Sequence, residues 1–156
     1  MEDHLGNSIK DVQFTAYERK NESKFLLANI NDTSKANQTV ILSGHTDVFI
    51  QLPRKSESKH EPFSGKKFDI DRDVIVHGCG TSDMKGGIIS ICKSLGELSN
   101  SGELSNVCVI GAFSSDEETG NYQSLRKFGE LLSFSSYCII VEPTTLEFHY
   151  LGENGI

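Results

Sequence analysis

The sequence predicts an α/β fold, a layered sandwich whose mostly parallel central sheet is flanked by helices. Apolar runs without alternation, at 39–44 and 107–113, are typical of strands buried on both faces, and a third apolar run at 137–141 predicts a further strand. Segments with helical periodicity lie between these runs, so strand and helix alternate along the chain. The 156 residues match the size of one ordinary domain and are enough to bury a core.

The N-terminal part of the chain is predicted to consist of strands. Residues 1–10 look loose, whereas residues 11–17 alternate between apolar and polar side chains, as in a strand. Residues 24–30 form a second strand candidate, and a polar turn at 31–38 follows it. The apolar, β-branched start of 39–48 then predicts a buried strand.

A long polar segment follows this strand. Residues 49–72 contain Pro53 and Pro62, and we expect them to form a surface loop. Residues 73–78 are apolar enough to predict a short strand.

The period then changes to that of an amphipathic helix. Its apolar stripe consists of Met84, Ile88, Ile91, Cys92, Leu95 and Leu98. The pentamer Gly-Glu-Leu-Ser-Asn occurs twice, at 96–100 and 102–106. We interpret it as a small duplication that lengthens the loop after this helix.

The last third repeats the strand and helix pattern. Residues 107–115 predict a buried strand, and 124–132 predict a helix. Residues 136–143 predict a strand that Pro143 ends, and 146–151 predict a last strand.

Composition excludes several function classes. Fifteen Lys and Arg residues against 22 Asp and Glu give a formal charge of −7, which argues against binding nucleic acid or anionic membranes. No apolar run approaches the ~18 residues of a membrane span. The N-terminus is polar and acidic rather than a secretory signal, so we expect a cytoplasmic protein.

The four cysteines contain no C-x-x-C pair, which argues against a zinc knuckle or a thioredoxin-type redox pair. Cys92, Cys108 and Cys138 lie in apolar runs, and we expect them to be buried small hydrophobic residues in a reducing compartment.

Polar side chains follow the ends of the predicted strands. The strand at 39–44 leads to His45 and Asp47, and the strands at 74–77, 107–113 and 137–141 lead to Asp83, to Asp116-Glu117-Glu118 and to Glu142. In open α/β sheets, sites lie beyond the carboxyl ends of strands. Clustered carboxylates repel each other unless a cation compensates, and histidine with carboxylates is a good ligand set for zinc.

Each of these residues also has a purely structural interpretation. His45 could be a hydrogen-bonded structural histidine, although Asp47 could hold its second ring nitrogen, as metal-bound histidines require. Asp83 could be a helix N-cap. Residues 116–118 could form a solvated loop, and Glu142 could be a surface charge. Their joint position at strand ends favours a shared site.

Two other sites are weakly supported. The segment Gly-Cys-Gly-Thr-Ser-Asp has Asp83 where a dinucleotide-binding loop needs its third glycine, and Lys85 precedes rather than follows the glycine pair, so phosphate binding is disfavoured. Cys79 has no histidine fixed near it that would activate a nucleophile.

Four segments, SGHTDV, GCGTSDMKGG, SSDEETG and VEPT, occur in this order. Together they resemble the M20 family of zinc amidohydrolases, which includes acetylornithine deacetylases, succinyl-diaminopimelate desuccinylases and aminoacylases. The Glu142-Pro143-Thr144 sequence looks most like the deacetylase and desuccinylase branch.

The resemblance implies a pair of metal sites. His45, Asp83 and Glu142 would bind one zinc ion, and Asp83 would bridge to a second ion held also by Glu118. Cobalt or manganese could replace zinc. The paired ions would activate a water molecule and polarise the acyl oxygen.

The resemblance also implies catalytic roles. Glu117 would be the general base that takes a proton from the water and passes it to the leaving amine. Asp47 would orient His45, and the Asp83–Met84 peptide bond would be cis. The implied reaction is hydrolysis of an amide bond in an N-acyl amino acid or a small peptide.

The chain also departs from the family. Cys79 stands where the family usually has arginine. Residues 1–156 correspond to the N-terminal portion of the catalytic domain, without the lid or dimerisation domain and without the C-terminal segment that supplies the last histidine. His149 lies too close to Glu142 to replace that histidine with confidence, and His60 and His77 have no motif support. The alternative is therefore an inert fragment or split subunit that needs a complementary polypeptide, and a homodimer is expected only of a longer form.

Overall fold

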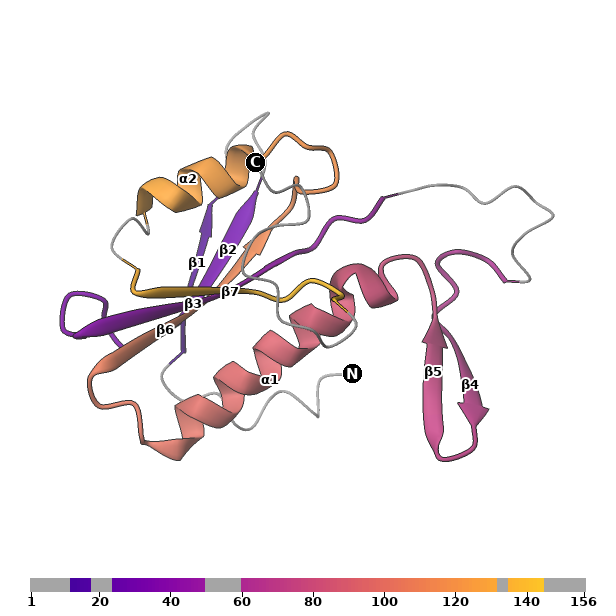
Figure 1. Ribbon diagram of the computed structural model, residues 1–156, viewed down its shortest axis with the longest axis horizontal. Coiled ribbons are helices and arrows are strands. Elements are labelled where there is room, and N and C mark those ends of the chain that lie inside the picture. The colour runs from indigo at the N-terminus through magenta and orange to yellow at the C-terminus, as the bar shows by residue number, and fades with distance from the viewer. Residues whose placement is uncertain (1–11, 18–23, 50–59, 132–134, 145–156) are drawn as a thin grey trace.

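A five-stranded sheet lies between two helices, one on each face (Figure 1). The computed structural model describes residues 12–17, 24–49, 60–131 and 135–144. The strands of this sheet are β1 (Val12–Tyr17), β2 (Phe25–Ile30), β3 (Gln38–His45), β6 (Val107–Ser114) and β7 (Tyr137–Ile140). The helices are α1 (Gly86–Ser101) and α2 (Gln123–Leu131).

The strand order is β1-β2-β6-β3-β7. β3 pairs in parallel with both β6 and β7, whereas β2 pairs antiparallel with both β6 and β1. Four of the five strands therefore run in one direction and β2 alone runs against them. The predicted layered α/β class with a mostly parallel sheet is confirmed.

The core consists of two apolar clusters, one on each face of the sheet. The cluster under α2 contains Phe25, Leu27, Ile41, Cys108, Ile110, Ala112 and Phe128. The cluster under α1 contains Ala28, Ile30, Ile91, Leu95, Val109 and Phe113. β6 contributes to both clusters and is buried throughout after its first residue, which explains its unalternated apolar sequence.

Helix α1 follows the predicted apolar stripe but begins at Gly86 rather than Met84. It continues to Ser101, and Gly102 ends it in the left-handed conformation with φ of 69°. The first copy of the repeated pentamer, 96–100, is therefore helical, and only the second copy lies in the following connection. The second copy lengthens the connection between α1 and β6, as the interpretation of a small duplication predicts.

Residues 49–72 are not wholly a loop, because β4 (Lys66–Ile70) pairs antiparallel with β5 (Asp73–His77). The pairing aligns Phe68 with Ile75, which gives this polar segment an apolar cross-strand contact. The hairpin is a separate two-stranded sheet and stands away from the central one (Figure 1). β5 therefore does not belong to the sheet edge that the sequence predicted for it.

The burial predicted for three cysteines is confirmed only for Cys108. Cys92 and Cys138 are exposed. Cys92 lies beside the buried stripe of α1 rather than within it, and Cys138 lies on β7, whose four residues are all exposed at the sheet edge.

The predicted strand at 146–151 and the loose residues 1–10 lie outside the described residues. Among the helices that the structure describes, none combines the length and apolar character needed to cross a membrane.

Candidate metal centre

The candidate centre lies at the end of the sheet where β3, β6 and β7 terminate. His45 is the last residue of β3, Glu117 and Glu118 lie in the turn after β6, and Glu142 follows β7. Since these three strands are parallel, their carboxyl ends meet at one edge. Asp83 is not on a strand of this sheet. It lies in the turn η1 (Thr81–Lys85), directly before α1, and its side chain points to the same edge.

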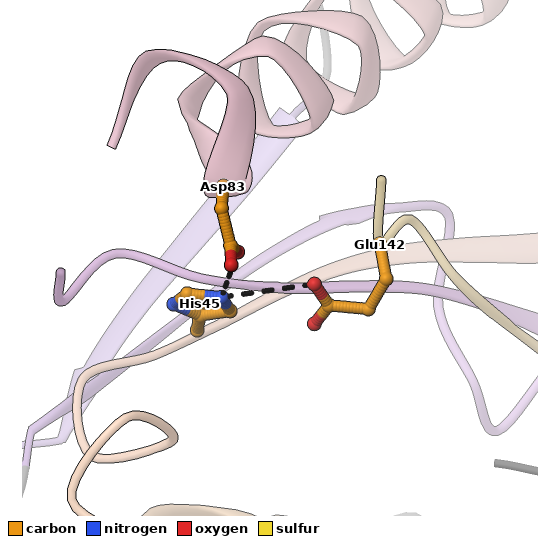
Figure 2. Close-up of side chains that lie close together, drawn as sticks. All are labelled: His45, Asp83 and Glu142. Atoms are coloured by element: carbon orange, nitrogen blue, oxygen red, sulfur yellow. Dashed lines mark hydrogen bonds and ion pairs between the residues drawn. The ribbon is translucent and has the colours of Figure 1, made fainter. Parts of the chain in front are cut away.

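Acidic side chains lie close to one ring nitrogen of His45, and Figure 2 shows two of them, Asp83 and Glu142. His45 Nε2 lies 3.1 Å from Asp83 Oδ1, 3.8 Å from Glu142 Oε2 and 4.0 Å from Glu117 Oε2. The imidazole is only 2% exposed, whereas the carboxylates are partly open to solvent. A small cation could reach the group from the side of the acids.

The other ring nitrogen of His45 faces Asp47. Nδ1 lies 3.0 Å from the main-chain oxygen of Asp47 and 3.4 Å from its carboxylate Oδ1. A proton on Nδ1 can be donated to this carbonyl, which leaves the Nε2 lone pair directed at the acids. The nearest orienting group is thus the carbonyl of Asp47, although its carboxylate lies just beyond.

Asp47 also connects His45 to the glutamate turn. Its Oδ2 accepts a hydrogen bond of 3.0 Å from the backbone N–H of Glu118. The same residue therefore contacts the histidine with one group and the turn with another.

Tight packing between β3 and the start of α1 brings Asp83 to His45. Met84 is fully buried, and its Sδ accepts a hydrogen bond of 3.1 Å from the backbone N–H of His45. A Cβ at Gly44 would lie 2.8 Å from Met84 Cε, so only glycine allows this approach without a shift. The Asp83–Met84 peptide bond is cis, as the family resemblance implies.

The interpretation of Asp83 as a helix N-cap is not supported by this geometry. The residue at the N-cap position of α1 is Lys85, and no side chain caps that end of the helix. Asp83 has non-helical dihedral angles and its carboxylate points at His45 (Figure 2).

Among the residues that the structure describes, two groups of side chains could hold a metal ion, His45 with Asp83 and Glu142, and His45 with Glu117 and Glu118. Within each group the ligand atoms lie within 4.8 Å of one another. Tetrahedral zinc with bonds of 2.0–2.2 Å needs ligand atoms about 3.4 Å apart. In the first group, the distances from His45 Nε2 are 3.1 Å to Asp83 and 3.8 Å to Glu142 and bracket this value. These nitrogen and carboxylate donors therefore suit a divalent cation of this kind.

Without a cation, the cluster binds protons more tightly than isolated side chains would. Burial, together with neighbouring carboxylates, raises the pKa of Glu117 and of Glu142 above 4.5, although His45 opposes the rise. Burial opposes protonation of His45, but its acidic neighbours, with Glu142 foremost, outweigh burial and raise its pKa above 6.5. A cation would relieve this accumulation of negative charge.

The structure thus brings together the six residues to which the family resemblance gave roles, His45, Asp47, Asp83, Glu117, Glu118 and Glu142. Two further histidines fall within the described residues, and they lie elsewhere. His60 and His77 lie beside each other at the β4–β5 hairpin, with ring centroids 5.4 Å apart. His149 lies outside the described residues. The supporting roles of Gly44 and Met84 were missed, because only their contacts with each other and with His45 reveal them.

A histidine and carboxylates that converge at the parallel strand ends of a layered α/β domain form the kind of site that holds a divalent metal ion. The chain belongs to peptidase family M20/M25/M40, whose sequence model matches residues 41–152.

Curated relatives and solved structures agree with this family. The chain is 30% identical over 132 residues to succinyl-diaminopimelate desuccinylase of Acidovorax ebreus (strain TPSY), with 80% of this chain and 32% of the relative covered. It is 34% identical over 95 residues to probable carboxypeptidase S-like 2 of Dictyostelium discoideum, with 61% and 17% covered. An M20 family metallo-carboxypeptidase from Sulfolobus solfataricus superposes with a TM-score of 0.65 and 26% identity, with 83% of this chain and 28% of that chain covered. The chain therefore spans about a third or less of the length of these proteins.

Proposed function

We propose that this chain carries the first metal site and the general base of an enzyme that hydrolyses amide bonds. The substrate class is an N-acyl amino acid, of the kind that deacetylases and desuccinylases cleave, or a small peptide. The observation that carries this proposal is the convergence of His45, Asp83 and Glu142 within ligand distance at the strand ends. Relatives named as a desuccinylase and as carboxypeptidases support the reaction class.

His45, Asp83 and Glu142 would hold one zinc ion, and Asp83 with Glu118 would contribute to a second. The metal, when bound, supplies an acidic centre that lowers the pKa of water and polarises an acyl oxygen. The chain itself supplies the oriented imidazole, fixed through the Asp47 carbonyl, and the carboxylates that neutralise the cation.

Glu117 is proposed as the general base. Its Oε2 lies 4.0 Å from His45 Nε2, and the residue belongs to the second candidate group rather than to that of His45, Asp83 and Glu142. Burial raises its pKa, which brings it closer to neutral pH, where a group can both accept and release a proton. Glu118, whose backbone is anchored on Asp47, would serve as the metal ligand of the glutamate pair.

A second candidate function is that of an inert piece or split subunit that needs a complementary polypeptide. It is favoured by β7, which lies at the edge of the sheet in the described part of the chain and exposes Tyr137, Ile139 and Ile140. An apolar edge strand of this kind is normally covered. Cytoplasmic location and homodimer formation remain predictions.

The test compares the chain with its Glu117→Gln variant. Zinc binding is measured by calorimetry, and turnover is measured on N-succinyl and N-acetyl amino acids and on dipeptides with zinc, cobalt or manganese. We expect Glu117→Gln to bind zinc as the parent does and to lose about 10²-fold or more in kcat. The matched control is Glu103→Gln, at an exposed site outside both candidate groups.

The outcomes separate the two functions. A Glu117→Gln variant with parental turnover would remove Glu117 from the base role. A chain that binds no zinc at neutral pH would contradict the metal-dependent function. A chain that binds zinc and turns over substrate only when mixed with a complementary M20 polypeptide would support the split subunit.

A further inference from the structure

A buried carboxylate that belongs to neither candidate metal group lies directly before Glu117. Asp116 is only 3% exposed, although it stands in a run of three acidic residues. Burying a carboxylate is unfavourable unless hydrogen bonds compensate. Its contacts therefore indicate what the residue does.

The side chain of Asp116 is directed at the start of α2. Its Oδ2 accepts a hydrogen bond of 3.0 Å from the backbone N–H of Ser124, and its Oδ1 accepts one from the hydroxyl of the same serine. Ser124 is itself buried, so both hydrogen bonds are shielded from water. Charged acceptors make the stronger hydrogen bonds of proteins, and shielding strengthens them further.

The main chain of Asp116 closes the same loop. Its carbonyl accepts hydrogen bonds from the hydroxyl of Thr119, at 3.1 Å, and from the backbone N–H of Tyr122, at 3.5 Å. Thus Thr119, Tyr122 and Ser124 in the loop 116–124 all donate hydrogen bonds to Asp116, its first residue.

The glutamates lie inside this closed loop. Gly120 donates its N–H to the carbonyl of Glu117 at 2.8 Å, with a left-handed φ of 65°, which makes a tight turn over 117–120. On the side facing the centre, the N–H of Glu118 is held by Asp47. The Asp47 carboxylate therefore binds the turn directly, whereas the Asp116 carboxylate binds Ser124, where the loop ends.

We propose that Asp116 is a positioning residue for the metal centre, which holds Glu117 and Glu118 in place by binding Ser124 at the start of α2. This inference rests on the proposed function, because it concerns the same site. Residues that orient metal ligands typically contribute 10- to 100-fold to metal affinity.

The chain contains a matched control for this arrangement. Asp32 accepts hydrogen bonds from the N–H and the hydroxyl of Ser34, at 2.9 and 2.7 Å, which repeats the pairing of Asp116 with Ser124. Asp32 follows β2, whose C-terminal end pairs with the beginning of β6, so it lies at the opposite end of the sheet from the metal centre. Asp32 is exposed whereas Asp116 is buried, so Asp32→Ala controls for the loss of an aspartate–serine pair as such and leaves the glutamate turn untouched.

The experiment uses the full chain and three variants, Asp116→Ala, Asp116→Asn and Asp32→Ala. Amide hydrogen exchange is followed by NMR without metal, and zinc affinity is measured by chelator competition. We expect Asp116→Ala to lose about tenfold or more in zinc affinity and to speed exchange at Glu118 and Gly120. Asparagine can accept from the N–H of Ser124 and donate to its hydroxyl, so Asp116→Asn should retain most of both properties. Asp32→Ala should change neither.

The result that overturns the proposal is faster exchange in Asp116→Ala confined to Ser124 and α2, with protection at Glu118 and Gly120 and zinc affinity unchanged. Asp116 would then only cap the helix. If Asp116→Ala does not fold, Ser124→Ala, which removes one hydrogen bond, is judged by the same two measurements. If the parent chain binds no zinc, the proposed function fails, while the exchange data still decide whether Asp116 fixes the turn.

Discussion

The Nε2 atom of His45 lies 3.1 Å from the Oδ1 atom of Asp83, although the two residues are 38 positions apart in the sequence. The distance is shorter than those from the same nitrogen to Glu117 and Glu142. The two side chains come from different structural elements, the end of β3 and the turn before α1. The fold therefore creates their contact. It is the shortest of the three distances between His45 Nε2 and the acids.

Replacing Asp83 by asparagine should weaken zinc binding strongly. The substitution keeps the size of the side chain and removes the negative charge nearest to His45 Nε2. We expect affinity to fall by more than the 10- to 100-fold typical of residues that merely orient a ligand, as measured by chelator competition. Asp69→Asn, on the hairpin, is the control. An Asp83→Asn chain with affinity within twofold of the parent would remove Asp83 from the ligand set.

Replacing Gly44 by alanine should destabilise the chain and displace the start of α1. The new Cβ would lie 2.8 Å from Met84 Cε and 3.1 Å from Ile88 Cδ1. The nearest atoms are side-chain ends that can shift, so we expect a cost at the lower end of the about 1–3 kcal/mol typical of overpacking, which urea denaturation can measure. Gly96→Ala in α1 is the control, since no atom lies within 4 Å of its added Cβ and a helix gains up to about 1 kcal/mol from alanine. Equal stability of the two variants would show that β3 and α1 are not tightly fitted here.

The stability of the metal-free chain should decrease as pH rises from about 4.5 to above 6.5. In the folded state, the pKa values of Glu117 and Glu142 are raised above 4.5. The pKa of His45 is raised above 6.5. The folded chain therefore binds more protons than the unfolded chain in this window, and each group's contribution is full below its unfolded pKa and lost above its folded pKa. Thermal unfolding at several pH values measures the slope.

Two controls test the origin of this slope. Glu142→Gln removes one of the raised carboxyls and should flatten the slope, and saturating zinc should reverse it because the metal binds the deprotonated ligands. A metal-free stability that rises steadily over the same window would contradict the electrostatic description of the site.

Truncating Leu95 should test the predicted face of α1. Leu95 is 3% exposed in the cluster between α1 and the sheet, so Leu95→Ala should cost about 2–5 kcal/mol. Ile89 on the same helix is 67% exposed, and Ile89→Ala should change stability by no more than about 0.5 kcal/mol. Similar losses from both variants would mean that the helix face is assigned wrongly.

Much of this architecture could be predicted from the pattern of side chains. Unalternated apolar runs correctly indicated β3 and β6, because a central strand is buried on both faces. The positions of His45, Glu117 and Glu142 after strand ends were visible in the sequence, since parallel strands end at one edge. The cis Asp83–Met84 bond followed from the family resemblance and not from the residues themselves.

Other features depend on contacts that periodicity does not contain. An apolar pattern predicts a strand at 73–77 but not its partner, so the separate hairpin of β4 and β5 was missed. The sequence cannot tell which of three consecutive acidic residues turns inward, and the burial of Asp116 emerges only from its pairing with Ser124. Cys92 adjoins the buried stripe of α1 in sequence but is turned to solvent.

The position of β7 has a consequence for how the centre responds to its ion. Within the described residues, this strand has a neighbour on one side only and pairs with it over four residues. If so short a strand opened, Glu142, which follows it, would leave the centre, and the apparent affinity for the ion would fall with the fraction of molecules in which the strand is closed. By the same equilibrium, an ion bound to Glu142 would stabilise the paired state of β7, so metal binding and strand pairing at this edge would be coupled.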